Sequence, residues 1–361
     1  MLFSYVVYTL LVLVVCSATF YVWKNCNVRY SVLLIPSFCY AFLVGMRYDV
    51  GADWFSYHDY YIYVLAGGDL DLEFAYVFLN KTVAFFGLNY QAFFIVVALL
   101  EILLLYKFLE RRRRICFFGV LLYFLIGPFF SSLNLVRQSL AFFVFLYALR
   151  YIESRDWKRY AVMMILAFGF HTSSLVLVPL YFVNRIDDSF LNKRILLLGL
   201  FALTVLFGST LMERLGNLFF EMVDAWQYQR YASGFLENSF SYGLGFIGIK
   251  LIDLIMICYA AKLNRVFKNE GFTVIWWIYY IGVLIFNMGM ANQLTIRMSY
   301  CMTSLRFVLL SYLCCYAFLI VKCKTKLVTV VTVCILLFSV MTFYGAIAQG
   351  HNGCSPFQFA L

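Results

Sequence analysis

A cation, two carboxylates and two aromatic rings lie close together between residues 47 and 57. Arg47 is followed by Asp49 and Asp53, and then by Trp54 and Tyr57. A guanidinium group binds phosphate oxygens through two parallel hydrogen bonds, and carboxylates beside aromatic faces suit the hydroxyls and the ring of a sugar. The structural alternative is a local ion pair between Arg47 and one of the two carboxylates. The segment therefore predicts either a site for an anionic sugar derivative or a short-range ion pair.

Three further arginines lie in or beside long apolar stretches: Arg137, Arg297 and Arg306. An arginine in or near hydrocarbon is costly and usually has a partner. Each one alone is explained as a helix cap or as a side chain that reaches the lipid headgroups. Several at one level favour a shared anionic ligand. We therefore predict that Arg47, Arg137 and Arg297 bind an anion, with Arg306 either a deeper contact to it or a structural residue.

One histidine interrupts an apolar stretch. His171 is followed by Thr172 and Ser173, and a neutral imidazole with a pKa of about 6.5 can accept a proton from a sugar hydroxyl. A lone histidine in an apolar helix is more often a hydrogen-bonded structural group. Its place at a polar break favours chemistry, so we predict His171 as the first choice of general base and Asp53 as the second.

The elements that position these residues are membrane helices. Of the 361 residues, 64% are hydrophobic and 13% are charged, whereas a soluble domain has about 25% charged residues. The sequence predicts an all-α polytopic integral membrane protein, with residues 1–361 in a single membrane domain. Because a span needs about 20 apolar residues, we expect about 10–12 transmembrane helices plus re-entrant or interfacial segments. The predicted spans are 2–23, 30–46, 91–109, 115–133, 138–152, 195–212, 243–262, 272–290, 299–321 and 327–346.

The basic residues predict the orientation. Twenty of the 28 Lys and Arg residues fall in connections that share one side if the helices alternate, and the positive-inside rule places that side in the cytoplasm. Both chain ends then face outward, as do two polar segments, 47–73 and 213–242. The alternation requires segment 160–183 to be a re-entrant hairpin with its tip at His171. Segment 74–87 must likewise lie at the interface or re-enter.

Several function classes lack their motifs. The sequence has no Walker loop and no GxGxxG after a strand, and no Cys/His cluster with the spacing of a metal site. We therefore expect no metal, no cofactor and no nucleic acid partner, and ATP-driven transport by this chain is disfavoured. Lys250 and Asp253 lie three residues apart and predict an internal ion pair. Together with Glu101 they would also suit a proton-coupled carrier.

The order and spacing of the polar motifs resemble those of the EpsG-type polysaccharide polymerases, a branch of the Wzy O-antigen polymerases. The motifs that carry the resemblance are Arg47-x-Asp49-x-Gly51-x-Asp53 followed by Tyr57, then Arg137-Gln138, Phe170-His171-x-Ser173, Arg297-x-x-Tyr300 and Pro356-Phe357. They extend over nearly the whole chain. This chain departs from the family pattern in having Ala52 where Thr is common, a spacing one residue tighter before Tyr300, and Phe357 in place of Tyr.

The resemblance implies a substrate, a reaction and a location. Such enzymes join undecaprenyl-pyrophosphate-linked oligosaccharide repeat units by glycosyl transfer at the periplasmic face of the bacterial inner membrane, and a GT-C-like architecture is expected. A chain-length regulator and a flippase are the partners it allows, besides the lipid bilayer. The resemblance places the pyrophosphate at the four arginines. The residues it offers for sugar binding are Asp49, Trp54, Tyr57, Gln138 and Tyr300.

Two other functions stay open. A lipid-linked sugar flippase or a proton-coupled transporter would need ionisable groups along a path through the membrane, and Glu101, Lys250, Asp253 and Arg306 are the residues in question. A membrane O-acyltransferase that modifies the glycan would also use a membrane histidine. The concentration of charge at one predicted face favours an enzyme over a transporter, and the several arginines argue against the acyltransferase.

Overall fold

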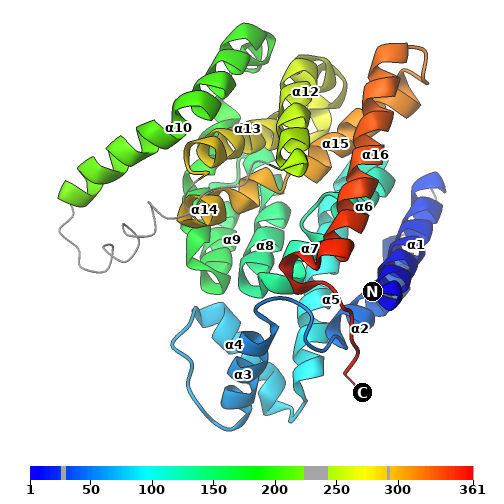
Figure 1. Cartoon of the computed structure of the whole chain (residues 1–361), viewed down its shortest axis with the longest axis vertical. Helices are drawn as coiled ribbons and strands as arrows, with labels where there is room; N and C mark the ends of the chain where they lie inside the picture. Colours follow the sequence, from blue (N-terminus) through cyan, green and yellow to red (C-terminus); the bar gives the residue numbers. More distant parts are fainter. Residues whose placement is uncertain (26–29, 223–242, 291–292, 361) are drawn as a thin grey trace. The chain divides into compact units, whose positions relative to one another are not determined.

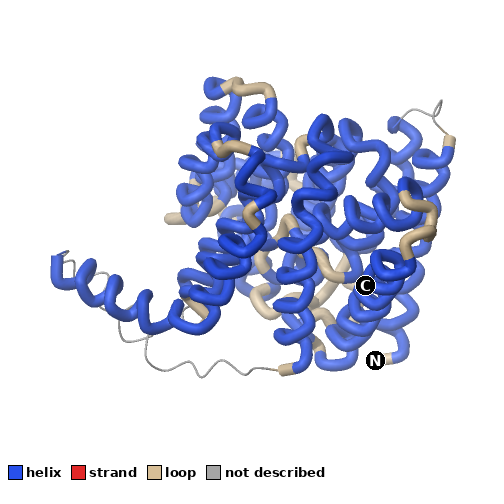
Figure 2. The backbone as a smooth tube through the Cα atoms, turned by 90° about the horizontal axis from the view of Figure 1, so that it is seen from above, coloured by secondary structure: helices blue, strands red, loops and turns tan. Residues whose placement is uncertain are grey.

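The chain is built from helices, because a backbone in hydrocarbon must satisfy its polar groups within the same segment. The computed structural model describes residues 1–25, 30–222, 243–290 and 293–360, and the regular elements among them are helical (Figure 2). Five helices are long and apolar enough to span a membrane: Leu2–Lys24, Tyr90–Leu125, Leu244–Glu270, Thr295–Ile320 and Lys326–Gln349. Shorter apolar helices accompany them. The prediction of an all-α polytopic membrane protein is confirmed.

Two compact units make up the chain, Met1–Tyr181 with Leu310–Leu361 and Phe182–Leu309 (Figure 1). The helices of the first unit are α1 (Leu2–Lys24), α2 (Leu34–Gly45), α3 (Trp54–Leu65), α4 (Phe74–Phe85), α5 (Tyr90–Leu109), α6 (Cys116–Leu125), α7 (Phe129–Asn134), α8 (Val136–Glu153), α9 (Trp157–Phe170) and α16 (Lys326–Gln349). Its shorter elements are η1 (Tyr30–Leu33), η2 (Glu110–Ile115), η6 (Tyr316–Ile320) and η7 (His351–Gly353). The prediction that residues 1–361 form a single membrane domain stays a prediction.

The second unit contains η4 (Asp188–Asn192), α10 (Arg194–Met222), α12 (Leu244–Phe267), η5 (Lys268–Glu270), α13 (Phe272–Met288) and α14 (Gln293–Thr303). Two elements cross the unit boundary, η3 (Thr172–Arg185) and α15 (Arg306–Cys315). Of the polar segment predicted at 213–242, residues 223–242 lie outside the described residues.

Each predicted span coincides with a helix, but two of the spans are interrupted. The span predicted at 115–133 ends as a helix at Leu125, because Gly127 and Pro128 follow and a proline cannot continue a helix interior. The chain resumes in the short helix α7. The span predicted at 299–321 is divided between α14 and α15, which leaves Arg306 at the start of a helix.

The first unit gathers its basic connections at one end. The indole nitrogen of Trp23, at the end of α1, donates to the carbonyl oxygen of Arg114 at 3.0 Å. Arg112 of η2 is paired with Glu153 at the end of α8. In the second unit, the predicted basic connections 185–194 and 262–268 also meet. There the side chain of Lys268 lies 2.5 Å from that of Asp188. Contacts thus join the basic connections after α1, α5 and α8 in the first unit, and those at 185–194 and 262–268 in the second. The predicted orientation in the membrane stays a prediction.

The segment after α9 doubles back along that helix. The hydroxyl of Tyr160 donates to the carbonyl oxygen of Leu177 at 2.6 Å, and the hydroxyl of Tyr181 donates to that of Arg155 at 2.8 Å. Residues 26 positions apart in sequence touch only if the chain reverses between them. The reversal follows His171, which ends α9 in an extended conformation. Segment 160–183 has the hairpin geometry that the predicted re-entry needs, and the re-entry itself stays a prediction.

The end of the first unit opposite the basic connections is closed by the C-terminal tail. The amide of Tyr48 donates to the carbonyl oxygen of Gln358, and that of Gly51 to the carbonyl oxygen of Gly353, each at 2.9 Å. Gly51 has a φ of +108°, and a Cβ atom there would lie 2.3 Å from the carbonyl oxygen of Leu133. Only glycine allows both this backbone conformation and this approach. The segment after Arg47 is therefore clamped between the tail and the end of α7.

We predict that Gly51→Ala destabilises the first unit far more than Gly67→Ala. Both glycines have positive φ, but a Cβ at Gly67 has nothing within 4 Å. The control therefore carries only the backbone strain, about 1 kcal/mol. Gly51→Ala adds an overlap worth about 1–3 kcal/mol more. Thermal aggregation of the two detergent-purified variants measures the difference, and equal losses would contradict the packing shown for Gly51.

Candidate active site

The start of α8 is held in place by the buried side chain of Arg47. That residue is 2% exposed, and its guanidinium donates to the carbonyl oxygens of Val44 at 2.8 Å, Val50 at 3.2 Å and Leu133 at 3.5 Å. The guanidinium also lies 4.4 Å from the ring centroid of Phe94. Its hydrogen-bond acceptors are thus backbone carbonyls, not a neighbouring carboxylate. Arg47 fixes the turn between α7 and α8, and its predicted contact with a pyrophosphate stays a prediction.

The two aspartates of the same motif differ in their surroundings. The backbone amide of Asp53 donates to Oδ1 of Asn134 at 2.7 Å, which ties the start of α3 to the same α7–α8 turn. The Asp53 carboxylate is half-exposed and has no hydrogen-bond or ion-pair partner among the described residues. Asp49 is exposed and has a φ of +50°. Asp53 thus offers an available carboxylate beside the start of α8.

The aromatic residues of the motif are buried. Trp54 is 1% exposed, and its ring is stacked with those of His58 and Phe94 at centroid distances of 5.1 and 6.1 Å. Tyr57 is 6% exposed and lies close enough to Arg137 for the two side chains to interact electrostatically. Burial raises the pKa of Tyr57 above its ordinary value although Arg137 opposes the shift. The Tyr57 phenol therefore stays protonated at neutral pH. In this structure Trp54 belongs to the core, and Tyr57 contacts the Arg137 site.

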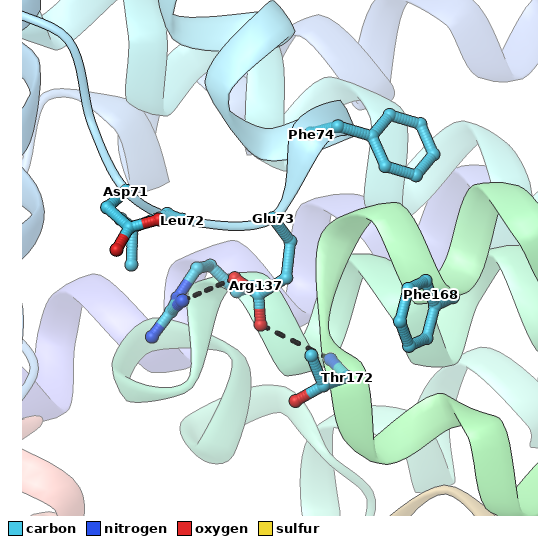
Figure 3. A pocket seen from close by; sticks show the side chains of 7 residues that line it. All are labelled: Asp71, Leu72, Glu73, Phe74, Arg137, Phe168 and Thr172. Carbon is cyan, nitrogen blue, oxygen red and sulfur yellow. Dashed lines mark hydrogen bonds and ion pairs between the residues drawn. The ribbon is translucent and has the colours of Figure 1, made fainter.

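Arg137 lies in the wall of a pocket of about 390 Å³ (Figure 3). The lining residues are Asp71, Leu72, Glu73, Phe74, Arg137, Phe168 and Thr172. Nη1 of Arg137 lies 2.5 Å from Oε2 of Glu73, and the backbone amide of Thr172 donates to the other oxygen of Glu73 at 3.2 Å. Nε of Arg137 is buried without a hydrogen-bond partner. The pocket therefore joins the starts of α4 and α8 to the break after α9.

His171 and Gln138 flank this pocket through Ser173. The Nδ1 atom of His171 accepts from the backbone amide of Ser173 at 3.1 Å and lies 2.8 Å from its hydroxyl oxygen. Nε2 of Gln138 lies 3.5 Å from the same hydroxyl. Because Nδ1 accepts a hydrogen bond, the proton of a neutral imidazole is on Nε2. His171 is thus arranged to donate from Nε2, whereas a base would need a lone pair there.

The structure brings together the first three of the predicted motifs. Arg47, Asp53 and Tyr57 meet the start of α8, and Arg137 with Gln138 meets the break at His171. Glu73 is the central residue that the sequence did not single out. It was one acidic residue among several in the polar segment 47–73. The only signal was its position directly before an apolar helix.

The remaining predicted residues belong to the second unit or its boundary. Arg297 is exposed and Tyr300 is half-buried on α14. Nε and Nη2 of Arg306 each lie 3.2 Å from Oδ1 of Asp253. The predicted pair of Lys250 and Asp253 is confirmed, with 3.5 Å between Nζ and Oδ2.

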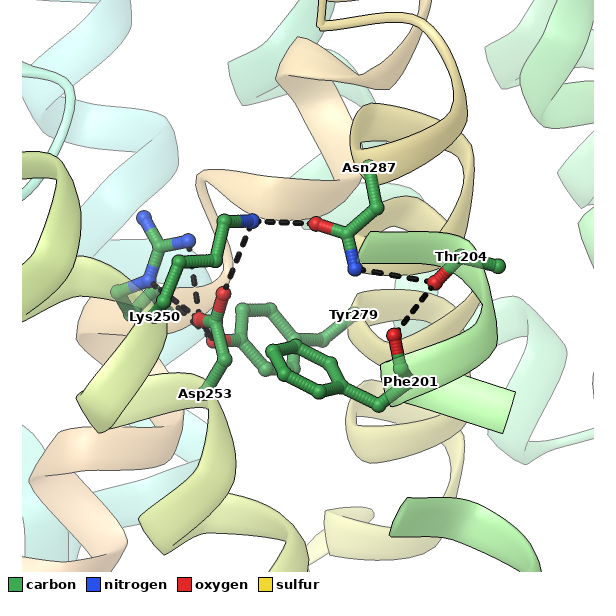
Figure 4. Close-up of polar contacts among 7 residues, drawn as sticks. Phe201, Thr204, Lys250, Asp253, Tyr279 and Asn287 are labelled. Atoms are coloured by element: carbon green, nitrogen blue, oxygen red, sulfur yellow. Dashed lines mark hydrogen bonds and ion pairs between the residues drawn. The ribbon is translucent and has the colours of Figure 1, made fainter. Parts of the chain in front are cut away.

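Asp253 is the centre of a buried polar network (Figure 4). It is 1% exposed, accepts from the hydroxyl of Tyr279, and faces both Lys250 and Arg306. Lys250 also donates to Asn287. A carboxylate that compensates two buried cations is stabilising mainly because its loss leaves them unpaired. The network therefore links α12, α13 and α15.

We predict that Asp253→Ala lowers the free energy of unfolding by about 3–5 kcal/mol, the usual cost of breaking a buried ion pair. The matched control is Asp69→Ala. Asp69 is paired with Lys81 at 2.5 Å, but both side chains are exposed, so solvent replaces the lost contact. Thermal unfolding in detergent measures both variants. A control that loses as much stability as Asp253→Ala would show that the buried network has no special weight.

A known protein family matches most of the chain. No curated protein and no solved structure matches the sequence. The family model of EpsG matches residues 30–359, a range that includes the Arg47 motif, the Arg137 pocket and the Asp253 network. The chain belongs to the EpsG family.

Proposed function

We propose that this protein is a glycosyltransferase that polymerises oligosaccharide repeat units carried on undecaprenyl pyrophosphate. The observation that carries the proposal is the pocket at Arg137, at the end opposite the basic connections. There the guanidinium of Arg137 meets Thr172, which offers a backbone amide and a hydroxyl, and Tyr57 lies beside Arg137. Membership of the EpsG family supports a polysaccharide polymerase-like role. The product is O-antigen or a related surface polysaccharide. The proposed location is the bacterial inner membrane, with the pocket facing the periplasm.

The reaction transfers the growing chain from its carrier to the next repeat unit. The bond between C1 of the donor sugar and the pyrophosphate oxygen breaks, and a bond from C1 to the acceptor hydroxyl oxygen forms. Undecaprenyl pyrophosphate leaves with the bonding electron pair, so negative charge builds on it in the transition state. A preorganised cation acts most strongly on such developing charge. Arg137 is that cation, with Tyr57 as an electrostatically interacting neighbour.

The acceptor hydroxyl must lose its proton, and the geometry favours Asp53 over His171 as the base. The carboxylate of Asp53 lacks a partner among the described residues and lies close enough to Tyr57 to interact electrostatically. His171 has its Nδ1 occupied by the Ser173 amide. His171 then serves as a donor from Nε2 to a substrate oxygen. The preference for His171 as the base, drawn from sequence, is reversed in this proposal.

The transporter alternative is weakened by the pairing of its charges. Lys250 and Arg306 share the carboxylate of Asp253. A conducting path needs ionisable groups that exchange partners, whereas these three are held by hydrogen bonds to Tyr279 and Asn287. An O-acyltransferase would need the histidine as a base, which its hydrogen bond with Ser173 disfavours.

We predict that Arg137→Ala strongly slows chain extension. Purified protein in nanodiscs, supplied with lipid-linked repeat units and no ion gradient, should give a ladder of longer lipid-linked products. Arg137→Ala should reduce the rate by about 10²–10³-fold, as removal of one charge-stabilising donor does. Lys81→Ala, an exposed cation whose partner is Asp69, is the control and should retain the ladder. Normal ladders from Arg137→Ala would sink the proposal.

A pair of substitutions separates the two roles of His171. Glutamine can place an amide donor near the position of Nε2, whereas the shorter asparagine can place its amide only near Nδ1. We predict that His171→Gln retains more activity than His171→Asn, and that Asp53→Asn loses about 10²–10⁴-fold, the usual contribution of a general base. The extension rate in the same assay is the measurement. Full activity in Asp53→Asn together with inactive His171→Gln would return the role of base to His171.

A further inference from the structure

We propose that Glu73 is an internal competitor for the anion site of the pocket: its carboxylate occupies the Arg137 guanidinium and the Thr172 amide until a substrate phosphate displaces it. This inference rests on the proposed function only in naming that phosphate as part of a lipid-linked pyrophosphate. The occupied donor groups themselves are features of the structure.

The two oxygens of Glu73 are bound by two different donors. Oε2 lies 2.5 Å from Nη1 of Arg137, and Oε1 accepts from the backbone amide of Thr172 at 3.2 Å. A guanidinium with an adjacent backbone amide is also a donor set that suits phosphate oxygens. Figure 3 shows Glu73 reaching down from the loop before α4 to both groups. The carboxylate therefore fills the place that a phosphate would take.

The side chain of Glu73 is free to leave this position. Glu73 is the N-cap residue of α4, with an extended backbone (φ −62°, ψ 135°), yet its side chain makes no capping hydrogen bond to that helix. The carboxylate lines the pocket and its side chain is 12% exposed. Departure from Arg137 would thus require only rotation of the Glu73 side chain at the pocket wall. It would break no capping hydrogen bond of α4.

The charge of each anion affects whether Arg137 binds the pyrophosphate or the Glu73 carboxylate more tightly. A pyrophosphate carries more negative charge than a carboxylate, so it gains more from a half-buried guanidinium. The tethered carboxylate has the advantage of a high local concentration. After glycosyl transfer the carrier pyrophosphate must leave the same donors. Return of Glu73 to Arg137 opposes rebinding of the carrier pyrophosphate. Glu73 therefore favours release of this product.

The test uses inorganic pyrophosphate as the probe of the anion site. Its affinity is measured by the shift in thermal unfolding of the protein in nanodiscs and by inhibition of chain extension. Glu73→Gln removes the competing charge but keeps the side-chain length, and should bind pyrophosphate about tenfold tighter, the factor expected for one charge-assisted hydrogen bond. Asp71→Asn is the matched control, since Asp71 lines the same pocket but is not hydrogen-bonded to Arg137, whose carboxylate partner is Glu73, and should bind within about twofold of the wild type.

A second variant separates competition from a purely structural ion pair. Glu73→Asp keeps the charge but is one methylene shorter, so it cannot hold both donors at once. The competitor role predicts tighter pyrophosphate binding in this variant too. If the ion pair of Glu73 and Arg137 only stabilises the fold, the variant should have lower thermal stability and no higher affinity for pyrophosphate. Unchanged or weaker binding in both Glu73 variants would overturn the inference.

The outcomes also separate this inference from the proposed function. If the wild type extends lipid-linked chains but neither Glu73 variant binds pyrophosphate more tightly, the competitor role fails and the polymerase stands. If the Glu73 variants bind more tightly and Arg137→Ala abolishes that binding, but no chain extension occurs, the anion site stands and the polymerase fails.

Discussion

The guanidinium group of Arg47 lies in an apolar interior, where every donor without an acceptor is costly. It finds its acceptors in backbone carbonyls of α2, of the connection between α2 and α3, and of the end of α7. This one requirement ties the segment after α2 to the turn before α8. Gly51 allows the approach because a side chain there would overlap the Leu133 carbonyl. The position of Arg137 depends on that turn.

The sequence predicted the parts whose signals are local or periodic. Long apolar runs predicted the helices, and the clusters of Lys and Arg predicted which connections meet within each unit. The break at His171 was visible as polar residues inside an apolar stretch. The interruption after Leu125 was missed, because the average apolarity of the segment outweighed the Gly127-Pro128 pair that ends the helix.

The site was less predictable because its key contacts are distant in sequence. Glu73 and Arg137 are 64 positions apart, and Glu73 and Thr172 are 99 apart. Apart from its position directly before an apolar helix, nothing near Glu73 in the sequence distinguishes it from the other acidic residues of segment 47–73. The same limit explains Trp54. Its residue type fits a sugar platform, but the ring is 1% exposed and is stacked with His58 and Phe94, its neighbours in space.

The two charged clusters differ in what their carboxylates can do. Asp253 is 1% exposed and serves Lys250, Arg306 and Tyr279 at once, so its departure would strand two cations in a low-dielectric interior. Glu73 serves one cation and one amide at the edge of a pocket, and an incoming anion can replace both of its contacts. A carboxylate such as Asp253, whose contacts no ligand can replace, belongs to a structural network. A carboxylate such as Glu73, whose contacts an anionic ligand can replace, belongs to an exchangeable binding site. That difference in exchangeability is why we propose the chemistry at Arg137 and a structural role for Asp253.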